Sequence, residues 1–320
     1  MFEAAMTPTP QLPIEEVLRN ELVSGDTVLG TLGPIMSHLL ANHDNSLFSD
    51  EIVARVRGMI GHLANQMLDE LGRTLELADP GILAEGQGRE LASELATSQA
   101  LLTHCHALAL EWQLAERLEK RCAIDPVLTP LLQALIASTR EETAEMAMAL
   151  LASQVRFVQA QRRMELPLTE LPGDLFHHAV LTWQTFSGNS DEAALQMANR
   201  AMRDRFDEGA SRLGLLDRLV GAMGNGVRAA LSISHAGVAI FCTALASQSN
   251  QDRDVAVVST NDRQLARLAL ALRSAGLRPK DIEKEFLTIH PDTVLPEGFE
   301  SLRADRAGEM LQASGGWSPG

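Results

Sequence analysis

The spacing of apolar residues along the chain predicts a protein made of α-helices. The strongest signal lies between residues 50 and 75, where apolar residues recur three and four positions apart and therefore share one face of a helix. Ser49 or Asp50 is placed to cap the start of this helix. The same spacing returns from residue 87 to about residue 122. We therefore expect two long antiparallel helices joined by a short loop, which is a helical hairpin.

Shorter helices are expected on both sides of this hairpin. Before it, the pattern predicts one helix over residues 14–23 and another over 34–41, with Pro34 in the first turn of the second. After it, residues 125–126 are expected to open a helix, and residues 139–142 have the Thr-x-x-Glu pattern of a capping box for the next one.

A segment with two prolines, residues 166–172, cannot continue a helix, because proline lacks a backbone donor and forces its predecessor towards extended geometry. We expect a rigid connector there. Beyond it, Gly276 stands where a left-handed C-terminal cap is expected. The β-branched run at 255–258 is too short for a sheet, so we expect a loop or part of a helix turn. Helices are expected at 174–186, 191–206, 213–223, 226–232, 235–247, 262–275 and 280–287, with one weak helix within 296–311.

The predicted fold class is therefore all-α, either a multi-helix bundle or a HEAT-like helical array, in two subregions that meet near the proline connector. We divide the chain into a flexible leader over residues 1–13 and an N-terminal helical region over 14–122. A C-terminal helical region over 123–290 follows, and then a weak helix with a flexible tail over 291–320.

Composition narrows the classes of function. Asp and Glu number 42 against 27 Lys and Arg, which gives a net charge of −15. That sign disfavours binding to nucleic acid or to an anionic membrane. The most apolar stretch, residues 236–246, is shorter than a membrane-spanning helix. Three scattered cysteines fit a reducing compartment, and residues 1–13 lack the features of a signal peptide. We expect a cytoplasmic protein.

Several motifs in the second half resemble a known family. They are Met148-Ala149-Leu150-Leu151-Ala152-Ser153-Gln154 with Arg156-Phe157, then Gln161-Arg162-Arg163-Met164-Glu165-Leu166-Pro167-Leu168 and Leu171-Pro172-Gly173-Asp174-Leu175-Phe176-His177, and later Gly237, Phe241, Ala244-Leu245-Ala246 and the run 268–277. With these motifs, Leu132 to Pro291 resembles the alphaproteobacterial family called domain of unknown function 2336. The resemblance implies a helical, partly HEAT-like fold and a bacterial origin, and it brings no activity, cofactor or catalytic residue.

Candidate reactive groups are few. The imidazoles of His104 and His106 lie two positions apart on a helix, so they point in different directions and cannot chelate one ion. His177 and His178 invite a phosphorelay interpretation, but a phosphotransfer histidine must be exposed, and the residues that follow them are apolar. No phosphate-binding loop or nucleophile elbow occurs in the sequence. We assign no catalytic residue, no metal site and no cofactor.

One basic group stands out in this acidic chain, because Arg156, Arg162 and Arg163 lie near the end of one predicted helix, just before the connector. They either stabilise the helix C-terminus through its dipole or bind an acidic segment of a partner protein.

We expect a non-enzymatic adaptor that binds another protein through helical grooves, with homo-oligomerisation left open. Two alternatives are a small-ligand protein or enzyme with a pocket between helices, and a phosphorelay component that uses a helix-borne histidine.

Overall fold

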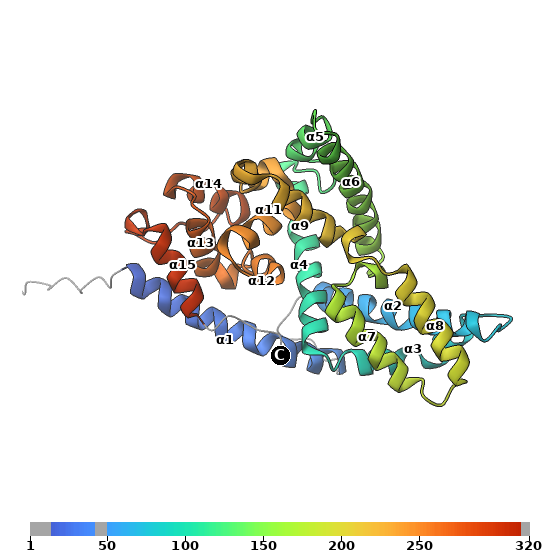
Figure 1. The fold of residues 1–320 in the computed structure, drawn as a ribbon. Coiled ribbons are helices and arrows are strands. Elements are labelled where there is room, and N and C mark those ends of the chain that lie inside the picture. The colour runs from blue at the N-terminus through green and yellow to red at the C-terminus, as the bar shows by residue number, and fades with distance from the viewer. Residues whose placement is uncertain (1–13, 42–49, 315–320) are drawn as a thin grey trace, which may run out of the picture.

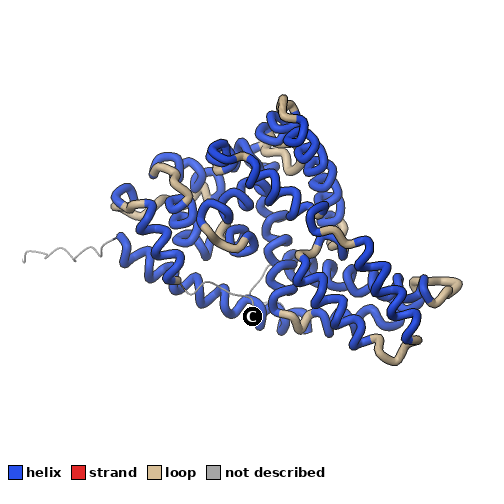
Figure 2. The backbone as a smooth tube through the Cα atoms, in the orientation of Figure 1, coloured by secondary structure: helices blue, strands red, loops and turns tan. Residues whose placement is uncertain are grey.

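The computed structural model describes residues 14–41 and 50–314, and their regular structure is helical throughout (Figure 1). Figure 2 shows helices joined by short loops, with no strand in the described ranges. The predicted all-α, multi-helix class is confirmed. The expected leader at 1–13 and the tail at 315–320 lie outside the described residues, as does the candidate cap Ser49.

The α-helices of the described chain have the following bounds: α1 Ile14–Ala41, α2 Asp50–Thr74, α3 Ile82–Leu95, α4 Gln99–Cys122, α5 Pro130–Ile136, α6 Glu141–Arg162, α7 Gly173–Phe186, α8 Glu192–Arg205, α9 Arg212–Ala222, α10 Val227–Ala230, α11 Ile233–Ser249, α12 Arg253–Val258, α13 Leu265–Ser274, α14 Pro279–Ile289 and α15 Ala304–Ala313. Short 3-10 helices lie at η1 Leu168–Glu170, η2 Glu208–Ala210, η3 Gly224–Gly226, η4 Asp262–Gln264 and η5 Phe299–Ser301.

Helix α4 is the centre of the molecule. It packs against α1 and α2 from its own half of the chain and against α11, α12 and α14 from the other half. In Figure 1 it runs between a group formed by α2, α3, α7 and α8 and a second group formed by α11 to α15. Nearly every side chain from Leu101 to Leu118 is buried, and each fully buried leucine contributes roughly 1.5–3 kcal/mol. The two halves are therefore held together by one shared core helix.

The N-terminal helix differs from the prediction, because one helix, α1, spans the range in which two short helices were expected. Pro34 lies inside it. Contacts with distant residues hold the middle of α1: Gln264 donates to the carbonyl of Gly25 over 2.8 Å, and Arg267 forms an ion pair with Asp26. A Cβ on Gly33 would lie 1.8 Å from the Gln99 side chain of α4. Tertiary packing thus overrides the local breaking tendency of glycine and proline.

The helix expected over 87–122 is divided into α3 and α4. Ser98 adopts an extended conformation, and its hydroxyl accepts the backbone N–H of Leu101, so it caps α4. Helix α3 still packs antiparallel against α2, which gives the expected hairpin with a shorter second arm. An N-cap inside a continuous apolar pattern therefore starts a new helix.

One predicted helix start and one predicted cap were wrong. Helix α5 begins at Pro130, capped by the Thr129 hydroxyl. The Asp125 carboxylate instead accepts two backbone N–H groups that follow it and forms a turn. Helix α6 has Arg140 at its N-cap and no side-chain cap hydrogen bond, so the expected capping box of Thr139 is not formed.

The proline segment forms a short η1 helix whose backbone is bonded to α2. The His62 imidazole Nδ1 lies 2.9 Å from the Leu166 carbonyl oxygen, while Gln66 donates to the same oxygen and accepts the N–H of Leu168, each over 2.9 Å. Leu171, near the C-terminal end of the proline segment, is fully buried. These bonds give the expected rigid connector a fixed place on α2.

The seven helices expected between residues 174 and 287 are present in the predicted order as α7 to α11, α13 and α14, with ends that differ by up to three residues. Gly276 has a φ of +87° and ends α13 in the left-handed conformation that was predicted. The run at 255–258 belongs to α12, and the weak C-terminal helix is α15. Gly237 (φ +72°) bends α11, and its missing Cβ leaves room for the Thr129 side chain.

No single helix among residues 14–41 and 50–314 is long and apolar enough to cross a bilayer. Gly224–Ala230 and Ile233–Ser249 reach that length and composition only as a pair, which is bent by 117°.

Candidate functional site

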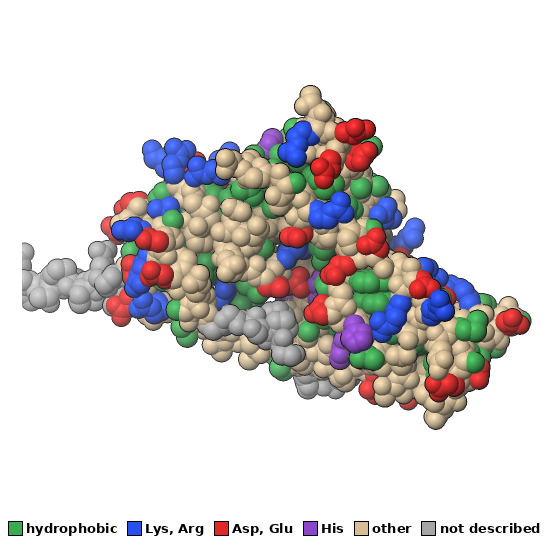
Figure 3. Space-filling view, viewed as in Figure 1, with side chains coloured by type: hydrophobic (Ala, Val, Ile, Leu, Met, Phe, Trp, Pro, Cys, Tyr) green, Lys and Arg blue, Asp and Glu red, His purple; other side chains and the backbone are tan. Residues whose placement is uncertain are grey.

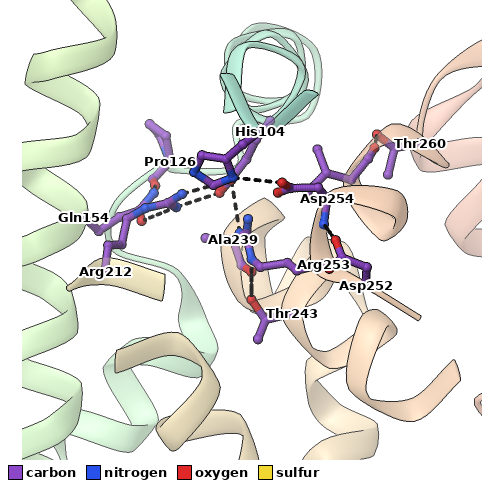
Figure 4. A network of polar contacts seen from close by, with 12 residues as sticks. His104, Pro126, Gln154, Arg212, Ala239, Thr243, Asp252, Arg253, Asp254 and Thr260 are labelled. Carbon is purple, nitrogen blue, oxygen red and sulfur yellow. Dashed lines mark hydrogen bonds and ion pairs between the residues drawn. The ribbon is translucent and has the colours of Figure 1, made fainter. Parts of the chain in front are cut away.

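The predicted basic residues Arg156 and Arg162 are exposed on α6, and Arg163 directly follows that helix. A buried polar network, drawn in Figure 4, contacts the other side of α6 through Gln154. Arg212, the first residue of α9, donates to both carboxylate oxygens of Glu111 on α4, over 2.7 and 3.0 Å. Arg253 of α12 donates to Glu111 over 3.0 Å and to the Thr243 hydroxyl over 2.9 Å. The carboxylate joins α4 to α9 and α12, and Arg253 extends the network to Thr243 of α11.

The Glu111 carboxylate is charged within the core. Its side chain is 1% exposed, and burial alone would raise its pKa, but Arg212 and Arg253 outweigh burial and lower the pKa to about 2. Three guanidinium N–H groups occupy its oxygens. A carboxylate that is fully paired and so acidic acts as a structural anion and not as a general base.

The same network fixes the middle of α6. Arg212 donates to the Gln154 amide oxygen over 3.3 Å, and its guanidinium carbon lies 3.6 Å from the centroid of the Phe157 ring. The Gln154 amide nitrogen donates to the Pro126 carbonyl over 2.9 Å. These contacts come from consecutive turns on the inner side of α6, so they set which side chains point outward.

The last turn of α6 is bonded to α2. Arg55 donates to the main-chain carbonyl of Gln161 and is itself paired with Glu51 over 2.8 Å. The Gln161 side chain is buried, with its amide nitrogen 3.3 Å from the Met59 sulfur. The C-terminal end of α6 therefore has little freedom to rotate.

What α6 presents to solvent is a continuous stripe, which we call the α6 outer face. At its centre Met148 and Val155 are 52% and 38% exposed, and because they are seven residues apart they lie on the same side of the helix. The exposed members of this face are Glu141, Glu142, Glu145, Met148, Ala149, Ala152, Val155, Arg156, Gln159, Arg162 and Arg163.

The structure places all three predicted site residues, Arg156, Arg162 and Arg163, at the exposed basic end of this face. Arg163 lies 4.0 Å from Glu165, a loose pair with the arginine side chain 72% exposed. Among the described residues, Arg156 and Arg162 have no ion-pair partner. In Figure 3, acidic side chains gather at the upper end of the α5–α6 corner and basic ones lie further down its right-hand edge.

A cavity of about 120 Å³ lies beneath Arg156, between α6, the connector and the start of α9. Phe157 and Leu213 are among its apolar lining residues, and Glu170 accepts the backbone N–H of Arg212 at its edge over 2.7 Å. Its volume is below the roughly 300–1,000 Å³ of typical ligand sites. A larger open groove of about 500 Å³ lies between α2 and α3, and it is one place where the small-ligand alternative could bind its ligand.

The histidines near the middle of α4 are buried. His104 Nδ1 lies 2.8 Å from a carboxylate oxygen of Asp254, and burial lowers the pKa of His106 to about 4, although the Asp254 charge acts in the opposite direction. Within the described ranges, no three His, Cys, Asp or Glu side chains are placed to share a metal ion.

The structure corrects one expectation about α7. The apolar residues after His177 and His178 indicated that these histidines would not be exposed. Both His177 and His178 are exposed, because the apolar residues around them point inward as the core face of the same helix. Arg203 of α8 lies beside them, with its Nη2 3.3 Å from His177 Nδ1.

The sequence did not lead us to the Glu111 network. The one feature of the sequence that points to this network is a carboxylate in the otherwise apolar run of α4, between Leu110 and Trp112. Such a residue requires buried cations, but nothing local indicates that they are Arg212 and Arg253, which lie 101 and 142 residues away.

The chain matches no protein-family model, no curated protein and no solved structure. The resemblance to the domain of unknown function 2336 family therefore stays an expectation.

Proposed function

We propose that this protein is a non-enzymatic protein-interaction or adaptor protein that binds a further protein chain through the α6 outer face. The observation that carries the proposal is the combination on one rigid helix of exposed apolar residues, Met148 and Val155, with exposed arginines that have no ion-pair partner among the described residues. Interfaces are enriched in arginine and methionine. We place its action in the cytoplasm, away from nucleic acid and membrane.

The buried network supports this proposal because it fixes the inner side of the same helix. Surfaces that bind without reorganisation lose less conformational entropy on association. Gln154, Phe157 and Gln161 are all held from within, by Arg212 and Arg55. The outer residues between them are therefore presented in one arrangement.

Photo-crosslinking in the native cell tests the proposal. A photoreactive amino acid at Ala152, in the middle of the face, is expected to give a protein adduct of defined mass. The same amino acid at Glu90, exposed on α3, serves as the control, and Val155→Asp is expected to abolish the Ala152 adduct. Equal adducts at both positions, or none at Ala152, would contradict the proposal.

A second candidate function, phosphotransfer, is favoured by the exposure of His177 and His178. Arg203 is near enough to pair with a phosphoryl group on His177, and α7 lies in a group with α2, α3 and α8. Incubation with phosphoramidate is then expected to give an acid-labile phosphate that is lost in His177→Ala or His178→Ala. Absence of such phosphate on the wild type would exclude this function.

A further inference from the structure

The charges of the α6 outer face are arranged in two blocks of opposite sign. The first turns of α6 carry the acidic block, the last turns carry the basic block, and small or apolar residues separate them. The acidic block is Glu141, Glu142 and Glu145, the basic block is Arg156, Arg162 and Arg163, and the middle is Met148, Ala149, Ala152 and Val155. Three positive and three negative charges make this face neutral in a chain of net charge −15.

Within the described residues, Arg163 is the one charge of the two blocks that forms an ion pair, a loose one with Glu165. Among the described residues, the three glutamates have no ion-pair partner, and the same holds for Arg156 and Arg162. The separation is too large for pairing within the helix, because Glu145 and Arg156 are eleven residues apart, or about 16 Å along the axis. A partner that satisfies both blocks must present the opposite order of charges along one line.

A second copy of α6 presents that order when it runs antiparallel. A two-fold axis beside the middle of the helix, near residues 150–152, places the acidic block of one copy beside the basic block of the other. Counting 100° per residue, Glu145 and Arg156 project on the same side of the face, so each lies beside the other in the partner. Glu141 similarly approaches Arg162 and Arg163.

We propose that the α6 outer face binds a second copy of this chain in an antiparallel, two-fold symmetric dimer, with Glu145 paired to Arg156 of the partner subunit. This inference rests on the proposed function, since it names the partner of the same surface. Two-fold contacts use one self-complementary patch, and the opposed charge blocks fix the antiparallel orientation. The small side chains Ala149 and Ala152 at the axis allow the two helices to approach closely.

The surface that one helix offers is small. Helix α6 has 22 residues and is therefore about 33 Å long. One pair of such helices buries less than the roughly 1,600 Å² of a standard interface. Interfaces below the standard size belong to the weak and transient class, so the dimer is expected to exchange with monomer in solution.

Sedimentation equilibrium of a charge-swap series tests the proposal with the full chain. Glu145→Arg and Arg156→Glu are each expected to weaken the dimer at least about tenfold, because each places like charges together at two symmetric contacts. The double variant restores opposite charges across the axis, so its dissociation constant is expected to return to within about threefold of the wild type. Glu90→Arg, exposed on α3, is the matched control and is expected to leave the dimer unchanged.

Two results would overturn the dimer: a wild type that stays monomeric up to about 1 mM, or a double variant that associates no better than the single variants. Far-UV circular dichroism of each variant, all altered at exposed positions, verifies that the fold is intact. A crosslinked adduct at Ala152 whose mass differs from twice that of the chain would leave the proposed adaptor function standing and exclude the dimer. No adduct at all would exclude both.

Discussion

Removing the charge of Glu111 is expected to be among the most damaging isosteric changes that the core can undergo. In Glu111→Gln the side chain keeps its shape, but Arg212, 2% exposed, and Arg253, 14% exposed, lose their counter-ion. Breaking a buried ion pair by removing one partner costs about 3–5 kcal/mol. A second route gives a similar size, because a pKa lowered from 4.5 to about 2 corresponds to about 3 kcal/mol of stabilisation.

The assay is urea unfolding followed by far-UV circular dichroism, with Glu119→Gln as the control. Glu119 is exposed on the same helix, so its variant is expected to stay within about 0.5 kcal/mol of the wild type. The folded-state pKa of Glu111 is lowered, so its contribution is present above pH 4.5 and is lost as the pH falls towards 2. The Gln variant is expected to lack this component of acid sensitivity. A loss below about 1 kcal/mol at pH 7 would refute the reasoning.

Three further expectations concern single sites. Burial lowers the pKa of His106 from 6.5 to about 4, so the protein is expected to lose about 3 kcal/mol of stability as the pH falls from 6.5 to 4. In His106→Gln the free energy of unfolding, measured by urea titration, should depend less on pH over this range. Native protein should react with a thiol reagent at one cysteine, the exposed Cys122, and at all three only in denaturant, since the other two are buried. Gly214→Ala is expected to destabilise the protein by about 1–3 kcal/mol, since the added Cβ would lie 2.1 Å from a main-chain oxygen. Gly221→Ala on the same helix meets nothing within 4 Å, so it should be neutral or stabilise the protein by up to about 1 kcal/mol. Thermal unfolding of the two variants tests this difference.

The local spacing of apolar residues was sufficient to predict the helices whose apolar stripe faces the core. Helix α2 has this pattern throughout, and its prediction needed no tertiary information. Helix α1 shows where local rules fail, because its glycines and Pro34 favour a break. The contacts that keep it continuous come from Gln264 and Arg267, about 240 residues away in the chain, and no local pattern encodes them.

The candidate site was predictable only in part. The position of the three arginines near a helix end followed from the sequence, and the structure adds that they share a face with exposed Met148 and Val155. That combination depends on which side of α6 is buried, and the buried side is set by Arg212 and Arg55 from other helices. Helical period alone gives the stripes of a helix, and only the tertiary fold decides which stripe is exposed.

The central claim, that α6 presents its outer face to a second copy, is tested most directly by a disulfide at the two-fold axis. Ala152→Cys is introduced together with Cys122→Ser, which removes the exposed native thiol. The Cα atoms of residue 152 in the two copies are expected to come within the roughly 4.4–6.8 Å that a disulfide requires. Mild oxidation should therefore give a covalent dimer, while Glu90→Cys in the same background should not. An Ala152→Cys variant that stays monomeric after oxidation, or a Glu90→Cys variant that dimerises equally well, would contradict the account.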